Sequence, residues 1–138
     1  MYGKYRHTVD AKGRLIVPSK LREELGDAFY VTLGLDHCLT VYTEEGWQGI
    51  LDRYDAMPIS QSRKIRFLFA NAAKCEPDRQ GRFLLPAELR EYAGLQQEVT
   101  FIGQGGHAEI WDTATYDALE KETLTPENLA AAMEELGF

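Results

Sequence analysis

Two short turns carry the residues of this sequence that are best suited to chemistry. Each places an aspartate four residues before an arginine, Asp10 and Arg14 in DAKGR and Asp78 and Arg82 in DRQGR. An Asp carboxylate at the start of a turn accepts hydrogen bonds from the turn amides and so shapes the backbone. An Arg guanidinium forms paired hydrogen bonds with guanine O6 and N7, or binds phosphate. The pattern indicates an outward-facing Arg for nucleic acid, an ion pair that only stabilises the turn, or both together.

The two turns belong to an internal repeat. The segment VDAKGRLIVPSKLREELG aligns with PDRQGRFLLPAELREYAG, with Asp10 over Asp78. The identical pairs that follow include Gly13 and Gly81, Arg14 and Arg82, Pro18 and Pro86, Leu21 and Leu89, Arg22 and Arg90, Glu23 and Glu91, and Gly26 and Gly94. Identity at turn glycines, prolines and helix positions together indicates a duplication. The matched Arg22 and Arg90 each follow a leucine that is expected to be buried, so a shared helix alone would explain them.

Each copy is predicted to fold as strand, tight turn, strand, short helix and two further strands. Pro18 and Pro86 end their strands and begin the helices, because proline cannot donate to a β-ladder and suits the first helical turn. Gly13 and Gly81 supply the positive φ that the turns need. The expected strands are 5–9, 14–17, 29–33, 39–42, 98–102 and 108–111, and the expected helices are 19–25 and 87–93.

Further helices are predicted outside the repeat. Those at 44–56 and 62–73 would join the copies, 113–122 would follow the second copy, and 126–136 would end the chain with Thr125 as its cap. The second joining helix carries a basic run, Arg63, Lys64 and Arg66, beside Phe67 and Phe69. We interpret this run as the solvated side of an amphipathic helix.

The charge of the chain is polarised along the sequence. A formal net charge of -7 argues against nucleic acid as a partner, because affinity for phosphate comes mainly from Lys and Arg. Residues 1–22, however, contain Lys4, Arg6, Lys12, Arg14, Lys20 and Arg22 against Asp10 alone, whereas residues 109–138 are strongly acidic with Lys121 alone opposing. This asymmetry permits a basic face on an acidic protein. Weaker candidates for phosphate contacts are Lys4, Arg6, His7, Lys20 and Arg22.

Other features narrow the class of protein. The polar, basic opening MYGKYRHTVD is unlike a signal peptide, and no apolar run has the length of a membrane span, so a cytoplasmic protein is expected. Cys38 and Cys75 are expected as reduced, buried thiols. No spacing of His and Cys fits a metal site.

Three rival readings come from other classes of protein. The paired Asp10 and Asp78 resemble the two aspartates of an aspartyl hydrolase, but an Arg four residues after each would depress both pKa values, whereas such a dyad keeps one carboxyl protonated. A cysteine nucleophile has no supporting motif. An assembly protein that does not bind DNA stays open, with Trp47, Phe67, Leu68 and Phe69 as its ring contacts.

The sequence resembles the MraZ family, whose members carry two tandem domains of the AbrB or SpoVT type, each with a DxxxR motif. The resemblance covers the MYGKY opening, both DxxxR turns, both P-x-x-L-R helices and the joining helices. It implies an α+β fold of duplicated swapped-hairpin, AbrB-like β-barrel units with bridging and C-terminal helices. The implied organisation is a first unit at 1–56, a bridging helix at 57–74, a second unit at 75–124 and a C-terminal helix at 125–138.

The resemblance also implies a function. Members are cytoplasmic, nucleoid-associated transcriptional regulators of the bacterial division and cell-wall gene cluster, which bind promoter repeats as ring-shaped homo-oligomers. Neither a cofactor, a metal, a small-molecule substrate nor a membrane is implied. The residues carried over to the DNA interface are Asp10, Lys12, Arg14, Asp78, Arg79 and Arg82. Because Gln80 stands where the first copy has Lys12, we expect the first unit to lead DNA contact and the second to assist.

Overall fold

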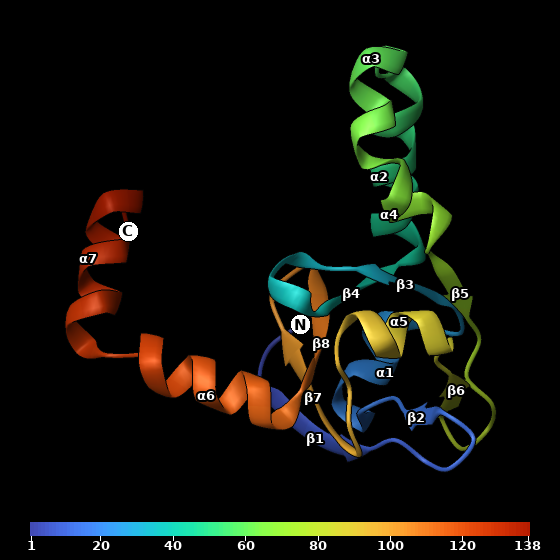
Figure 1. The fold of residues 1–138 in the computed structure, drawn as a ribbon, viewed down its shortest axis with the longest axis horizontal. Coiled ribbons are helices and arrows are strands. Elements are labelled where there is room, and N and C mark those ends of the chain that lie inside the picture. Colours follow the sequence, from blue (N-terminus) through green and yellow to red (C-terminus); the bar gives the residue numbers. More distant parts are fainter.

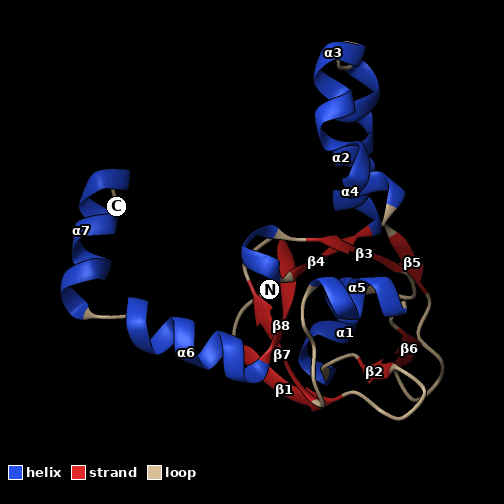
Figure 2. Ribbon diagram, in the orientation of Figure 1, coloured by secondary structure: helices blue, strands red, loops and turns tan.

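The computed structural model describes all of residues 1–138, which form two antiparallel sheets with helices around them (Figures 1 and 2). The six-stranded sheet has the order β1-β7-β8-β4-β3-β5, and β2 and β6 form a separate two-stranded ribbon. The strands are β1 (Lys4–Thr8), β2 (Arg14–Ile16), β3 (Phe29–Leu33), β4 (Leu39–Thr43), β5 (Ala73–Cys75), β6 (Arg82–Leu84), β7 (Glu98–Gly103) and β8 (His107–Asp112). The α+β class and the duplicated units are confirmed, and β1 and β5 are the open edges of the large sheet.

The two copies exchange strands with each other. Strand β1 of the first copy pairs with β7 of the second, and β5, which precedes the second turn, pairs in the same way with β3 of the first. The ribbon joins β2 to β6, and β4 pairs with β8 between the halves. At the ends of the ribbon, Val17 N donates to Gly81 O at 2.8 Å and Leu85 N donates to Gly13 O at 3.1 Å. The swapped-hairpin arrangement therefore occurs within one chain, about a pseudo-twofold axis.

A single hydrophobic core holds both copies together. Its 18 buried residues come from both repeats, and most of them form equivalent pairs, such as Leu15 with Phe83 and Leu21 with Leu89. The rings of Phe29 and Phe83 meet edge-on at 5.1 Å between centroids. Because each copy supplies half of this core, neither copy could bury its apolar residues alone.

The short helices of the repeat follow the prolines as predicted. Helices α1 (Ser19–Leu25) and α5 (Ala87–Tyr92) begin directly after Pro18 and Pro86, and they pack against β4 and β3 of the large sheet. Gly26 follows α1 with a φ of 72°, a conformation that favours glycine. Helix α1 buries Leu21 and Leu25, and α5 buries Leu89.

The joining segment forms a helical hairpin that stands out from the sheet (Figure 1). Its first helix, α2 (Glu44–Ala56), is confirmed, with Thr43 accepting from Gly46 N as its cap. The predicted helix at 62–73 is wrong, because the segment consists of α3 (Ile59–Ser62), the 3-10 turn η2 (Arg63–Ile65), α4 (Arg66–Ala70) and then β5. The backbone of Ile65 is non-helical, and Ala73 pairs with Val31 at the free edge of β3. Pairing with an otherwise open strand edge satisfies these backbone groups outside the helix.

A second helical projection forms the end of the chain. Helix α6 (Thr113–Thr123) leaves β8 with Asp112 as its cap, and Tyr116 packs edge-on against Trp111 at 5.4 Å. Helix α7 (Pro126–Leu136) begins after the cap Thr125 and ends at Gly137, as predicted. It stands away from the sheets and from the helical hairpin (Figure 1). None of the helices has the length and apolar character required to cross a bilayer.

Candidate nucleic-acid interface

The first DxxxR turn is built around one carboxylate. Asp10 Oδ1 accepts hydrogen bonds from the backbone amides of Lys12 and Arg14, both at 2.9 Å. Asp10 Oδ2 accepts from Arg14 Nε at 2.8 Å. The chain reverses at Gly13, whose φ of 80° lies in the left-handed region that favours glycine. The carboxylate thus determines both the shape of the turn and the direction of the guanidinium.

The second turn repeats this geometry. Asp78 Oδ1 accepts from the amides of Gln80 and Arg82 at 2.9 Å, and its Oδ2 accepts from Arg82 Nε at 2.8 Å. Gly81 also has a φ of 80°. Both arginines use only Nε within the chain, and their Nη nitrogens make no internal hydrogen bond. The ion pair and the outward-facing Arg are therefore compatible, since the far edge of each guanidinium is free for a ligand.

Both aspartates are strongly favoured as anions. The hydrogen bond from the backbone amide of Arg14 is the main cause that lowers the pKa of Asp10, and the Arg14 guanidinium lowers it further. The pKa of Asp78 is lowered in the same way by Arg82. An aspartyl dyad needs one carboxyl with a raised pKa, so the electrostatics of these two turns oppose that chemistry.

The ribbon that follows the turns has one buried face and one outward face. Leu15 and Phe83 point into the core. In the antiparallel register Arg14 pairs with Leu84 and Ile16 pairs with Arg82. Paired residues share a face of a sheet, so the outward face carries four side chains in a cross pattern, Arg14, Ile16, Arg82 and Leu84. Ile16 and Leu84 are 44% and 62% exposed, which is unusual for aliphatic side chains in the middle of a ribbon.

Two further arginines reach across to the turn of the opposite copy. The guanidinium carbon of Arg90 lies 2.9 Å from the position that a Cβ on Gly13 would occupy, and that of Arg22 lies 3.1 Å from the same position on Gly81. Arg90 Nε also donates to Leu85 O at 3.1 Å. The positive φ of each turn favours glycine, and the guanidinium of an arginine from the opposite copy lies over it.

The other predicted contact residues fall into two groups. Lys12 and Arg79 are exposed within the turns and Lys20 is exposed on α1, and none of the three side chains makes an ion pair. By contrast, Lys4 Nζ lies 2.7 Å from Glu120 Oε1 and Arg6 Nη2 lies 3.0 Å from Asp117 Oδ2, both on α6. The structure therefore leaves Lys12, Lys20 and Arg79 without ion-pair partners, and it engages Lys4 and Arg6 with α6.

The side chain of His7, in β1, packs against the neighbouring strand of the large sheet. Its ring packs edge-on against Phe101 at 5.9 Å, and partial burial lowers its pKa. A lowered pKa disfavours the imidazolium form that would attract phosphate.

The sequence analysis missed Ile16 and Leu84, and it did not place Arg22 and Arg90 over the opposite turns. Ile16 and Leu84 could have been found from the alternation of RLIV and RFLL, in which the residue two after Arg must share its face. Arg22 and Arg90 were matched by the repeat but attributed to a shared helix. Their crossing to the opposite turn depends on the strand exchange, which no local pattern reveals.

The chain offers little for metal or thiol chemistry. No group of three or more His, Cys, Asp or Glu side chains could hold a metal ion. Cys38 and Cys75 are free and buried, and burial raises the pKa of each thiol to about 12. A nucleophilic thiolate is disfavoured at both positions.

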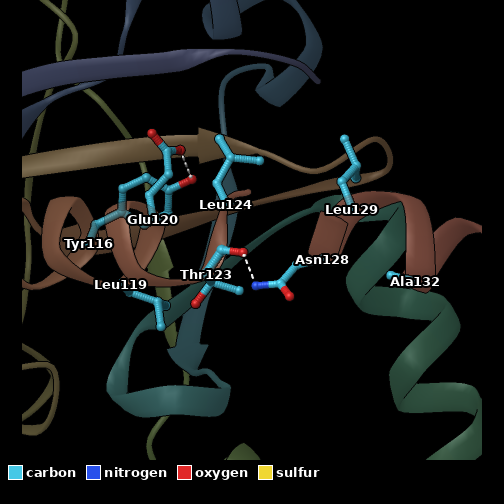
Figure 3. Close-up of a pocket in the computed structure, with 8 residues that line it drawn as sticks. All are labelled: Tyr116, Leu119, Glu120, Thr123, Leu124, Asn128, Leu129 and Ala132. Atoms are coloured by element: carbon cyan, nitrogen blue, oxygen red, sulfur yellow. Dashed lines mark hydrogen bonds between the residues drawn. The ribbon is translucent and has the colours of Figure 1, made fainter. Parts of the chain in front are cut away.

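A largely apolar hollow lies far from the turns, between α6 and α7 (Figure 3). It has a volume of about 350 Å³ and is lined by Tyr116, Leu119, Glu120, Thr123, Leu124, Asn128, Leu129 and Ala132. Two hydrogen bonds join residues of its lining, from Tyr116 Oη to Glu120 Oε2 and from Asn128 Nδ2 to Thr123 O. The hollow lies at the junction of the two helices, and none of its lining residues belongs to the ribbon.

Comparison with known proteins identifies the family. The profile described as "MraZ protein, putative antitoxin-like" matches the chain twice, at residues 1–68 and 68–136. Proteins named transcriptional regulator MraZ from Halothermothrix orenii and Acetivibrio thermocellus are each 44% identical to it, over 99% of this chain and 98% and 99% of their own lengths. The protein of that name from Carboxydothermus hydrogenoformans is 50% identical over 79% of this chain and 78% of its own. With both repeats matched and relatives similar from end to end, the chain belongs to the MraZ family.

Proposed function

We propose that this chain is a sequence-specific DNA-binding transcriptional regulator that reads DNA with the β2–β6 ribbon and its two turns. The observation that carries the proposal is the outward face of the ribbon, where two arginines oriented by aspartates alternate with two exposed aliphatic side chains. A two-stranded ribbon fits the major groove. The names of the relatives support regulation of transcription as the outcome of this binding.

The chemistry of the ribbon suits the edges of bases. The free Nη edge of an Arg forms paired hydrogen bonds with guanine O6 and N7, and an aliphatic side chain packs against the thymine methyl group. The Asp carboxylates hold the guanidinium groups in position before DNA arrives, which lowers the entropy cost of binding. The guanidinium groups of Arg22 and Arg90 add positive charge beside both turns.

The turns are equivalent in shape but unequal in charge. The first has Lys12 exposed, and the second has Gln80 at that position with Arg79 beside it. In this proposal the first unit, 1–56, leads DNA contact through Asp10, Lys12 and Arg14. The second unit, 75–124, assists through Asp78, Arg79 and Arg82.

Binding to repeats completes the proposal. One chain offers a small basic footprint, so several chains held in a ring would raise the effective concentration for each successive repeat. The resemblance to the family supports a ring-shaped homo-oligomer that acts in the cytoplasm, on the nucleoid, at promoter repeats of the division and cell-wall gene cluster. Lys20 would add a phosphate contact beside the ribbon. Lys4, Arg6 and His7 would do so only after leaving the partners described above.

Electrophoretic mobility shift with the region upstream of the chain's own gene tests this function. A regulator should shift that DNA at lower concentration than a shuffled duplex of equal length, and the shift should weaken as salt is raised. The competing function is an assembly protein without DNA binding. No shift with either duplex would favour that competitor, and an equal shift with both would contradict sequence-specific reading.

Exchanging the residues at the third position of each turn tests whether the two turns contribute unequally to DNA binding. Lys12→Gln should weaken binding to all sequences and reduce the slope of log affinity against log salt by about 1, because one phosphate contact is lost. Gln80→Lys should strengthen binding and steepen that slope by a similar amount. Fluorescence anisotropy over a salt series measures both variants. A slope that is unchanged in Lys12→Gln would show that the first turn does not contact phosphate.

A further inference from the structure

Helix α7 presents an apolar stripe that stays exposed, although part of it lines the hollow beside α6. Leu129, Ala132, Met133 and Leu136 follow at spacings of three and four residues, which places them on one helix face. Every residue from 126 to 138 is exposed. Isolated helices of this length are marginal in water, and in proteins they are stabilised mainly by packing of their apolar face. We therefore expect another apolar surface to pack against this stripe.

A second uncovered apolar surface lies at the base of the helical hairpin. A hollow of about 410 Å³ opens between η1 (Leu35–His37), α4 and α5, and we call it the α4 groove. Its apolar lining includes Leu33, Leu35, Ile65, Phe67 and Tyr92. Leu35 and Phe67 are 83% and 66% exposed. Large exposed apolar side chains that gather in one hollow are typical of an interaction site.

The two surfaces have opposite charge. Helix α7 carries Glu127, Glu134 and Glu135 and no basic residue. The α4 groove is bordered by the exposed basic run 63–66, of which Lys64 is part of the lining, and none of its three basic side chains makes an ion pair. Glu135 lies at the edge of the apolar stripe, next to Leu136. Two α7 helices packed on each other would instead bring like charges together, which disfavours that pairing.

We propose that the apolar stripe of α7 docks in the α4 groove of a second copy of this chain. Stripe and groove are different surfaces, so the contact is heterologous: each copy gives its helix to one neighbour and receives the helix of another. Repetition of such a contact produces a closed ring where the rotation between copies permits it. The inference rests on the ring in the proposed function and assigns the contact that builds it. The basic run, which suggested a solvated helix face, then serves the assembly.

Paired aspartate substitutions test the two surfaces separately. Met133→Asp in the stripe and Phe67→Asp in the groove should each raise the concentration needed for assembly at least about tenfold, because an unpaired charge would be buried. Ala131→Asp, on the opposite face of α7, and Gln61→Asp, outside the groove, add the same charge and should assemble normally. Sedimentation velocity without DNA measures all four variants, and circular dichroism shows whether each is folded.

Mixing the two defective variants gives the sharper result. Met133→Asp retains an intact groove and Phe67→Asp an intact stripe, so a mixture contains one intact contact. It should form a one-to-one pair and no larger assembly, which also shows that both variants are folded. An isologous contact between α7 helices predicts otherwise, since Phe67→Asp would assemble by itself and Met133→Asp would not join it.

Several outcomes would overturn the proposal. They are a single-chain mass for the unaltered protein at every concentration, normal assembly of Phe67→Asp, and a mixture that stays monomeric. A single-chain mass would also overturn the ring in the proposed function, whereas normal assembly of Phe67→Asp or a monomeric mixture would overturn only the docking contact. DNA reading by the ribbon is measured separately, by mobility shift of the unaltered protein. Failure of the docking proposal is therefore distinguishable from failure of the proposed function.

Discussion

Replacing Arg14 with alanine should abolish sequence-specific DNA binding at physiological salt. An Arg that reads a base contributes about 1–3 kcal/mol, and this loss is repeated at every subunit that engages a repeat. The turn itself should survive, because Asp10 keeps its hydrogen bonds from the amides of Lys12 and Arg14. The exposed ion pair contributes little to stability. Mobility shift with the upstream repeats measures the binding, and thermal unfolding measures the fold.

Two further variants separate base reading from charge. Arg53→Ala removes one positive charge from the exposed face of α2, away from the ribbon, and should bind DNA normally. Arg14→Lys keeps the charge but loses the forked geometry, so it should retain non-specific affinity and lose preference for the repeats. If Arg14→Ala shifts the repeats like the unaltered protein, the ribbon is not the reading surface.

Replacing Phe83 with alanine should lower the free energy of unfolding by about 3–5 kcal/mol, as expected for a large aromatic side chain removed from a core. Phe83 is buried between Phe29 of the first copy and Phe101 of the second. Because the copies share this core, one cooperative transition should shift for the whole chain. Urea unfolding followed by circular dichroism and by tryptophan fluorescence measures the shift, with Trp47 and Trp111 reporting on opposite halves.

The neighbouring residue on the same strand provides the control. Leu84 points outward, so Leu84→Ala should change stability by no more than about 0.5 kcal/mol. It should nevertheless weaken DNA binding if the aliphatic side chains of the ribbon contact bases. Two separate transitions in Phe83→Ala, one for each tryptophan, would contradict the shared core.

The duplication could be predicted from repeated identities in the sequence. Both turns and most of the helices could be predicted because they depend on interactions within a few residues. Asp10 bonds to amides two and four residues on, and Gly13 adopts the positive φ that its turn requires. Pro18 and Pro86 begin α1 and α5, and Thr125 caps α7. Each of these choices is made by the backbone and side chains of one short segment. The aspartates and arginines of the two turns were recognisable for the same reason.

Only the tertiary structure decided which strands pair and which side chains lie together on one surface. Period-two patterns indicate that a strand exists but carry no information about its partner. The family resemblance implied swapped hairpins, and the structure showed that β1 and β2 pair with strands of the second copy. That exchange aligns Arg14 with Leu84 on one face and brings Arg90 over Gly13. It also turned the end of a predicted helix into β5, because the open edge of β3 satisfies its backbone better. By itself the sequence determined the two turns; the long-range pairing of strands made them one surface.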